Sequence, residues 1–270
     1  MKFKINKDIA EFIKEGYVVR PLVNQDCVKS LGNRLKGKLF EIMEQEFDLK
    51  DYHRLVQSDD RHIDIHFEML MFLHETELHL EVLAENRTVF ESLLGPDIAV
   101  QASPHLRIAR PEKPQDNIGF HSDIDYGNTS YEMNCVIALN KLDKEGALKL
   151  LPASHARPVL KTIAVTNDKA PKGSKLNKLG VPYSYKRIVD ENYKEDMVPI
   201  PMNVGEVLCF NLGLVHGQEV NNSLDTRWSI DCRLKNILAP TNTRGGYYKV
   251  FSKSPMTQAA EKHLENNKNS

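Results

Sequence analysis

The chain has 270 residues, of which 41% are hydrophobic and 27% are charged, an ordinary composition for a globular protein. Its 36 basic and 37 acidic side chains leave a formal charge of −1, which excludes a general attraction to nucleic acid or to an anionic membrane. No apolar run approaches the ~18 residues of a transmembrane helix, and Lys2, Lys4 and Lys7 interrupt any signal-peptide core. We expect a soluble cytoplasmic protein that binds neither nucleic acid nor membrane.

The four cysteines, at positions 27, 135, 209 and 232, lie far apart and form no CxxC pair. This spacing gives no disulfide framework. Cys135, Cys209 and Cys232 each lie in a strand-like run, where a free thiol acts as a small core residue. We therefore interpret them as buried thiols.

The first part of the chain, residues 6–95, has mainly helical patterns. Ile9, Phe12 and Ile13 form one helical face, and Gly16 suits the end of that helix before a strand-like run at 17–19. Apolar residues from Val28 to Leu39 predict a second amphipathic helix, continuing toward Met43, and further helix is predicted over 62–94.

Short strand-like runs, punctuated by Gly, Asn and Pro, follow from residue 97 onward. They cover 98–110, 118–125, 132–140, 147–151, 197–200, 206–211, 213–217, 226–236 and 246–251. Many short strands after a helical region predict a sandwich or barrel with helices packed outside it.

No linker divides the sequence, so we predict one domain over 1–252, with a helical part at 1–95 and a β core at 96–252, and a polar C-terminal tail at 253–270. The stretch 161–195 is lysine-rich and has weak periodicity. A long irregular loop in a compact domain is typically a lid or disordered. We expect it to be a mobile lid.

The segment Gly119–Asp123 carries the first chemical signal. His121 and Asp123 stand two residues apart in a predicted strand, which places both side chains on one face. His216, in the apolar run 206–217, is a second imidazole that a facing strand can supply. Two histidines and one carboxylate on one side of a metal form the facial triad of non-haem Fe(II) oxygenases, which leaves adjacent positions open for a co-substrate and O2.

A polar strand face follows His216. Arg227, Ser229, Asp231 and Arg233 alternate with the apolar residues Trp228, Ile230, Cys232 and Leu234. The polar face lies either in water or, in a small barrel, in the lumen. In the lumen, the planar guanidinium of Arg227 would bind a carboxylate and Ser229 would add a hydroxyl donor. Arg107 or Arg233 is the alternative residue for holding that carboxylate.

These motifs resemble the phytanoyl-CoA dioxygenase-like branch of the Fe(II)/2-oxoglutarate oxygenases. The resemblance extends from residue 12 to about residue 236, and its most specific parts are His121-Ser122-Asp123, 146–155, 204–207, His216 and Arg227-Trp228-Ser229. It implies a double-stranded β-helix (jelly-roll) core with flanking helices. It also implies that 2-oxoglutarate binds Fe(II), with its distal carboxylate on Arg227. One departure is Ala153, where the family usually has glycine.

The resemblance implies further site residues. Asn134 stands where a polar co-substrate contact is common in the family. The stretch 123–134 is similar to members from sugar, aminoglycoside and surface-polysaccharide pathways.

Three further residues are candidate substrate contacts because of their position in the chain. Asp125 and Tyr126 lie just past the predicted metal pair. Arg107 precedes that pair in the chain, and it either faces the lumen and meets an anionic or polyhydroxylated substrate or lies on a solvated rim.

Other histidines compete for a metal role. His62 and His66 stand four residues apart, as in a zinc-protease helix, but Ile63 occupies the position where such proteases need glutamate. We expect these histidines either to satisfy local hydrogen bonds or to face solvent. His155 is interpreted, from the resemblance, as ordering a loop near the mouth of the site.

The predicted function is therefore hydroxylation of an aliphatic C–H bond in a small polar metabolite, with Fe(II), 2-oxoglutarate and O2 as cofactor and co-substrates. The same cofactors also support desaturation, epimerisation or cyclisation. A halogenase is disfavoured because Asp123 fills the position that chloride needs. A non-catalytic jelly-roll binding module is the alternative from another class.

Overall fold

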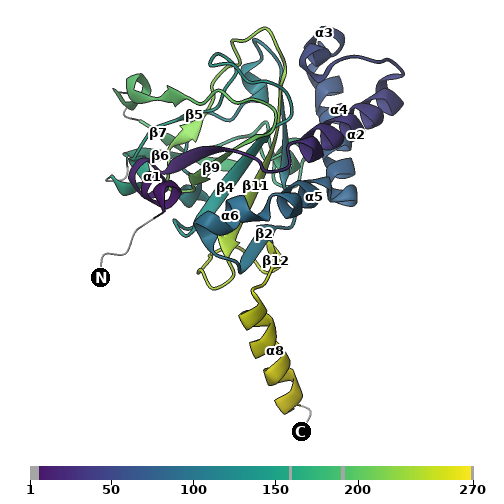
Figure 1. Ribbon diagram of the computed structural model, residues 1–270. Coiled ribbons are helices and arrows are strands. Elements are labelled where there is room, and N and C mark those ends of the chain that lie inside the picture. Colours follow the sequence, from purple (N-terminus) through teal and green to yellow (C-terminus); the bar gives the residue numbers. More distant parts are fainter. Residues whose placement is uncertain (1–5, 158–159, 190–191, 269–270) are drawn as a thin grey trace.

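A large antiparallel sheet and a smaller sheet enclose the centre of the molecule, and helices cover the outer face of the large sheet (Figure 1). The computed structural model describes residues 6–157, 160–189 and 192–268. The ends of the predicted domain and tail, at 1–5 and 269–270, and positions 190–191 of the predicted lid lie outside the described residues.

The strands are β1 (Tyr17–Pro21), β2 (Ile98–Gln101), β3 (His105–Ala109), β4 (Glu132–Ala138), β5 (Lys149–Leu150), β6 (Thr162–Thr166), β7 (Ser184–Ile188), β8 (Val198–Pro199), β9 (Glu206–Asn211), β10 (His216–Gly217), β11 (Arg227–Asn236) and β12 (Tyr248–Ser252). The large sheet has the order β1-β9-β4-β11-β2-β12, with β3 also paired to β11, and the small sheet has the order β10-β5-β8. This is the predicted double-stranded β-helix core.

The helices are α1 (Lys7–Glu15), α2 (Asp26–Met43), α3 (Tyr52–Leu55), α4 (Asp59–Thr76), α5 (Leu78–Glu85), α6 (Arg87–Leu94), α7 (Lys175–Lys178) and α8 (Pro255–Lys268). The predicted helix over 62–94 is in fact three helices. Glu77 has a left-handed backbone (φ 50°) between α4 and α5, and Asn86 separates α5 from α6. Asn86 is fully buried and its side-chain oxygen accepts a hydrogen bond from the Asn24 N–H at 2.7 Å. The break at Asn86 therefore coincides with a tertiary hydrogen bond, which the helical periodicity of the sequence does not indicate.

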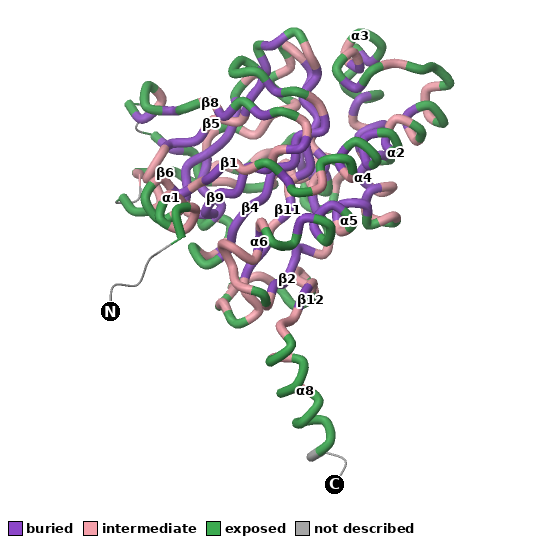
Figure 2. The backbone as a smooth tube through the Cα atoms, in the orientation of Figure 1, coloured by how far each residue is buried: buried purple, intermediate pink, exposed green. Residues whose placement is uncertain are grey.

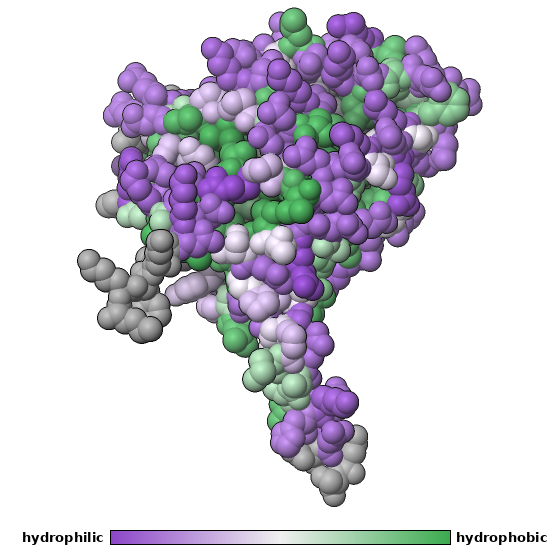
Figure 3. Space-filling view, in the orientation of Figure 1, coloured by the Kyte–Doolittle hydropathy of each residue, from purple (hydrophilic) through white to green (hydrophobic). Residues whose placement is uncertain are grey.

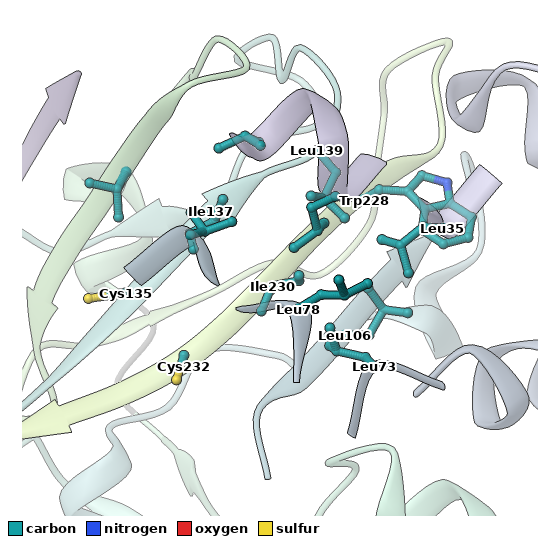
Figure 4. Close-up of a cluster of buried hydrophobic side chains, with 14 of the residues drawn as sticks. Leu35, Leu73, Leu78, Leu106, Cys135, Ile137, Leu139, Trp228, Ile230 and Cys232 are labelled. Atoms are coloured by element: carbon teal, nitrogen blue, oxygen red, sulfur yellow. The ribbon is translucent and has the colours of Figure 1, made fainter. Parts of the chain in front are cut away.

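The two faces of β4, β9 and β11 have different environments. Their outward side chains pack with the helices in the main hydrophobic core, where Trp228 also donates from Nε1 to the Leu49 carbonyl at 2.8 Å. Figure 4 shows part of this core; its labelled residues are Leu35, Leu73, Leu78, Leu106, Cys135, Ile137, Leu139, Trp228, Ile230 and Cys232. The inward residues of β4 and β9 pack against the small sheet in a second cluster. The polar side chains of β11 therefore face the lumen, as the alternation allowed.

The predicted strand over 118–125 is wrong. His121 makes an isolated antiparallel bridge to His216, and a 3-10 turn then spans Asp123–Tyr126. The strand predicted at 213–217 is also shorter than expected. Only β10, His216–Gly217, is a strand, because the residues before it form a turn. A reversal at this point brings Asp123 back toward the Leu212 carbonyl, which accepts the Asp123 N–H at 3.0 Å.

The lysine-rich segment 161–195 is not an irregular loop where the structure describes it. Strands β6 and β7 form a hairpin, and α7 lies between them in the chain. Lys175 of α7 forms an ion pair with Asp64 of α4, and the Leu179 carbonyl accepts from Arg107 Nη1 at 3.1 Å. We call residues 160–189 the hood, because several residues of this segment line the cavities outside the lumen, among them Val181 and Pro182.

The C-terminal helix α8 projects away from the body and is largely exposed (Figures 1 and 2). The predicted polar tail thus contains a helix over most of its length. Figure 3 shows a mostly hydrophilic visible face with smaller hydrophobic areas over the body. Within the described residues, none of the helices combines the length and hydropathy that crossing a bilayer requires.

Gly16 ends α1 as predicted and supplies the first testable prediction. Its φ is 84°, and an added Cβ would lie 2.4 Å from Leu214 Cδ1 and 2.5 Å from His155 Nδ1. We expect Gly16→Ala to lower the free energy of unfolding by about 1–3 kcal/mol or more. Alanine is strained in a left-handed backbone, and its Cβ would also clash with Leu214 and His155. Chemical denaturation measures this.

Gly37 is the matched control, since it lies exposed in α2 with nothing within 4 Å of an added Cβ. Gly37→Ala should raise the free energy of unfolding by about 0.5–1 kcal/mol, because alanine favours helix. Equal effects of the two substitutions would contradict the role of Gly16.

Candidate active site

His121, Asp123 and His216 converge at the open end of the barrel. One ligand atom from each lies within 4.8 Å of the other two, all three residues are buried, and no other such group occurs among the described residues. The bridge between His121 and His216 brings them together, through reciprocal N–H to carbonyl hydrogen bonds of 2.9 Å. The two imidazole centroids are 4.4 Å apart.

Backbone carbonyls orient both imidazoles. His121 Nδ1 lies 2.7 Å from the Gly119 oxygen, and His216 Nδ1 lies 2.9 Å from the Leu214 oxygen. A carbonyl only accepts, so each Nδ1 carries the proton and each Nε2 keeps its lone pair. Burial, followed by the neighbouring His121, lowers the pKa of His216 to about 4, which keeps this imidazole neutral. Both rings therefore offer Nε2 as a metal ligand in the usual second-shell arrangement.

The carboxylate of Asp123 is fixed by Arg233. Arg233 Nη2 donates to Asp123 Oδ2 at 2.8 Å, while Asp123 Oδ1 lies 3.5 Å from His121 Nε2. Burial alone would raise the pKa of Asp123, but Arg233 and the two histidines outweigh it and hold this pKa well below its ordinary value. The group is ionised, with one oxygen occupied by Arg233 and the other directed toward His121.

Arg227 lies at the inner end of the same cavity. The guanidinium donates from Nη1 to Gln218 Oε1, yet Arg227 Nε and Gln218 Nε2 are buried without any hydrogen-bond partner. Burial lowers the pKa of Arg227 to about 10, so the side chain is still a cation at neutral pH. Buried donors of this kind are rarely left unpaired, and together they fit an anionic ligand.

Of the other two predicted co-substrate residues, Asn134 lines this cavity and Ser229 is not among its lining residues. Asn134 of β4 lies opposite Arg233 of β11 and lines the cavity with Arg227 and the three candidate ligands. Ser229 is buried on the same face of β11, opposite Ala138. This inner cavity is small, about 60 Å³.

The predicted substrate residues are divided. Arg107 reaches the lumen, where its Nε donates to Asp231 Oδ2 at 2.9 Å. The Tyr126 ring meets the His121 imidazole edge to face, with ring centroids 5.6 Å apart, and lines the adjacent outer cavity. Asp125 instead pairs with Lys186 of β7 at 3.0 Å and lines a separate cavity beside His155. The structure therefore brings Arg107 and Tyr126 to the metal group and leaves Asp125 outside it.

One residue of the site and one contact were not predicted from the sequence. Gln218 directly follows the short strand β10, and no local pattern indicates that its amide meets Arg227. The contact of Arg233 with Asp123 is the other, although its position on the polar face of β11 was the available signal.

The competing histidines have structural partners. His62 Nδ1 lies 3.1 Å from the Tyr52 hydroxyl, and His66 Nε2 donates to the Leu106 carbonyl at 2.8 Å. His155 Nε2 donates to the Ile13 carbonyl at 3.1 Å, which ties the loop after β5 to α1. Cys135 and Cys209 are buried free thiols with their sulfur atoms 3.7 Å apart, as interpreted.

Residues 12–229 match the family model of phytanoyl-CoA dioxygenase (PhyH). The chain belongs to this family. Its chemistry is accordingly of the non-haem Fe(II)/2-oxoglutarate oxygenase type, with Fe(II) and 2-oxoglutarate as the cofactors. No curated protein sequence matches the chain.

Solved structures support the same fold. The apo form of the non-heme monooxygenase ThoJ has a TM-score of 0.54 and 14% identity, with 91% of this chain and 84% of that chain covered. The carbocyclase SnoK from nogalamycin biosynthesis has a TM-score of 0.53 and 15% identity, with 90% and 95% covered. The epimerase SnoN, in complex with Fe3+, alpha ketoglutarate and nogalamycin RO, has a TM-score of 0.51 and 12% identity, with 91% and 97% covered.

The donor set fits these cofactors. Two neutral imidazoles and one carboxylate suit Fe(II) and leave further coordination positions open. The unpaired donors of Arg227 and Gln218, which line the same cavity as the three candidate ligands, fit the distal carboxylate of a dicarboxylic acid.

Arg227 gives a prediction about the co-substrate. We expect Arg227→Ala to weaken 2-oxoglutarate binding by about 2–5 kcal/mol while metal binding persists, because a buried bidentate cation is removed. Titration of Mn(II)-loaded protein with 2-oxoglutarate measures this. Arg87→Ala, on the exposed part of α6, is the control. Unchanged affinity in Arg227→Ala would make Arg107 or Arg233 the anchor.

His66 gives a prediction about stability and pH. Burial, followed by the charge of His62, lowers the pKa of His66 to about 3. Because the unfolded pKa is about 6.5, protons bind the unfolded state more strongly, so this stability is present above pH 6.5 and is lost as pH falls toward 3.

His66→Gln should therefore reduce the loss of unfolding free energy between pH 7 and pH 5 by about 2 kcal/mol. Urea unfolding at both pH values tests it, with the half-buried His53→Gln as the control. An unchanged difference between the two pH values would exclude His66 as the titrating group.

Proposed function

We propose that this protein uses Fe(II) and 2-oxoglutarate to hydroxylate an aliphatic C–H bond of a small polar metabolite. His121, Asp123 and His216 hold the iron, and Arg227, with Ser229 and Asn134, binds 2-oxoglutarate. The observation that carries this proposal is one buried cavity that contains both the three ligand atoms and the unpaired donors of Arg227 and Gln218.

The chain's own residues have distinct tasks in this proposal. His121 and His216 present Nε2 because backbone carbonyls hold Nδ1–H. Arg233 occupies Asp123 Oδ2, which limits the carboxylate to one free oxygen. Arg227 neutralises and orients the distal carboxylate. When bound, Fe(II) with 2-oxoglutarate activates O2 for oxidation of the substrate, with succinate and CO2 as co-products.

The substrate enters from the hood side in this proposal. Tyr126, next to His121, and Arg107 line the outer cavity and are substrate contacts. Asp125 lines the separate cavity beside His155, where it contacts only a substrate that extends beyond the outer cavity. We propose a sugar or a natural-product or surface-polysaccharide precursor as the substrate. Relatives with this fold are a carbocyclase and an epimerase, so the oxidative outcome has to be measured directly.

The decisive experiment combines metal binding with turnover. We expect His121→Ala or His216→Ala to abolish substrate-dependent succinate formation and to lose most bound Fe(II), because each removes one of three ligands. His53→Gln, which lies outside the site, should retain both. Full turnover in either alanine variant would remove that residue from the ligand set.

The outcome is then read from the product mass over a panel of sugars, nucleotide sugars, amino acids and acyl-CoA compounds. Gain of one oxygen atom supports hydroxylation, loss of two hydrogen atoms supports desaturation or cyclisation, and an unchanged mass with succinate formation supports epimerisation. Iron and 2-oxoglutarate binding with no turnover on any candidate would favour the non-catalytic binding module.

A further inference from the structure

An outer cavity of about 210 Å³ lies directly outside the candidate ligands, between β3 and the hood. This cavity adjoins the inner one, because the two share lining residues. The shared residues include His121, Asp123, Arg107, Arg233 and His105. Val181, Gly180 and Pro182 of the hood form the opposite wall. A molecule in the outer cavity therefore lies next to the metal group.

Three cations and three anions line the two cavities, but one of the anions is paired with a cation outside them. The cations are Arg107, Arg227 and Arg233, and the anions are Asp123, Asp231 and Asp116. Asp116 pairs with the buried Arg110 at 2.7 Å, and Arg110 also pairs with the half-exposed Asp59, which has Lys113 as a second cation nearby. Of the remaining groups, Asp231 pairs with Arg107 and Asp123 pairs with Arg233, so one positive charge remains.

Loading the site leaves that excess unchanged. Fe(II) brings two positive charges and 2-oxoglutarate brings two negative charges, and the distal carboxylate takes Arg227 as its partner in the proposed function. Asp123 is then shared between the metal and Arg233. The uncompensated positive charge therefore lies with Arg233 at the outer cavity, and largely buried cations seldom persist without a counter-charge.

The side chains around Arg233 also suit an oxyanion. Arg233 and Arg107 are largely buried, with side chains 17% and 19% exposed. Arg233 donates from Nη1 and Nη2, and Arg107 donates from Nε and Nη1. Each guanidinium therefore has further N–H groups without a bond to the described residues. His105 of β3 lines the same cavities as a neutral imidazole, because burial and both arginines hold its pKa well below the ordinary value.

We infer that the outer cavity binds an oxyanion of the substrate, a carboxylate or a phosphate, through Arg233 with Arg107 and His105. The inference rests on the proposed function, and it narrows the substrate class to small metabolites that carry a negative charge near the oxidised carbon.

The test uses full-length protein loaded with Mn(II) and 2-oxoglutarate, with protein in excess over metal. Inorganic phosphate and 13C-labelled acetate are titrated separately, and the enhanced relaxation of 31P or 13C by the bound Mn(II) reports binding near the metal. We expect saturable binding of at least one probe, and the tighter probe identifies the anion as phosphate or carboxylate.

Val181 provides a variant that leaves the arginines and the ligands intact. Val181→Glu places a carboxylate in the outer cavity and should weaken probe binding at least about tenfold. Val181→Gln has the same size without the charge and should stay within about threefold. Arg233→Gln should also lose binding, but Val181→Glu decides the question because Arg233 additionally holds Asp123.

Each outcome is decisive. Loss of probe binding in Val181→Glu but not in Val181→Gln, with Mn(II) and 2-oxoglutarate still bound, supports the inference. No saturable binding in the loaded wild type, or equal binding in the two Val181 variants, overturns it and leaves the proposed function intact. Failure of the wild type to bind Mn(II) or 2-oxoglutarate overturns both.

Discussion

The two backbone hydrogen bonds between His121 and His216 are the constraint on which the site depends. They join segments that are distant in the sequence and are each 2.9 Å long. Gly217 makes this approach possible, since an added Cβ there would lie 2.7 Å from the Gly119 oxygen at a φ of 152°. The bridge sets the imidazoles side by side, and the turn after it brings Asp123 to the same point. The main chain therefore brings the three candidate ligands together, and Arg233 additionally fixes the carboxylate of Asp123.

Strand β11 shows how a buried polar lumen is sustained. Its outward residues Trp228, Ile230 and Leu234 are fully buried against the helices, and burial of such side chains contributes about 1.5–3 kcal/mol each. This contribution offsets the cost of desolvating Arg227 and Arg233 on the inward face. Ion pairs reduce that cost further for Arg233, whereas Arg227 keeps unpaired donors. Most charged side chains on the polar face are therefore paired, whereas Arg227 keeps donors available for an anionic ligand.

The sequence predicted the fold class, the alternation of β11 and the three candidate ligands because those features depend on local pattern and on residue type. It did not predict the bridge at His121, because nothing in residues 118–125 distinguishes a paired strand from an extended segment followed by a turn. The sequence did not predict the break at Glu77 either, because glutamate favours helix. The left-handed backbone of this residue is visible only in the folded chain. The pairing of Arg107 with Asp231 follows from the register of β3 against β11, which sequence spacing does not give.

Arg233 links the candidate metal ligands to the far edge of the large sheet. It donates to Asp123 Oδ2 and to the hydroxyl of Tyr247, which immediately precedes the edge strand β12. Its backbone N–H is in turn accepted by Gln101 Oε1 of β2, the strand between β11 and β12. The position of the Asp123 carboxylate therefore depends on three strands of the sheet, not only on the turn that carries it. Because Arg233 also faces the outer cavity, a group bound there acts on the same guanidinium that orients the carboxylate, which couples occupancy of the outer cavity to the geometry of the ligand set.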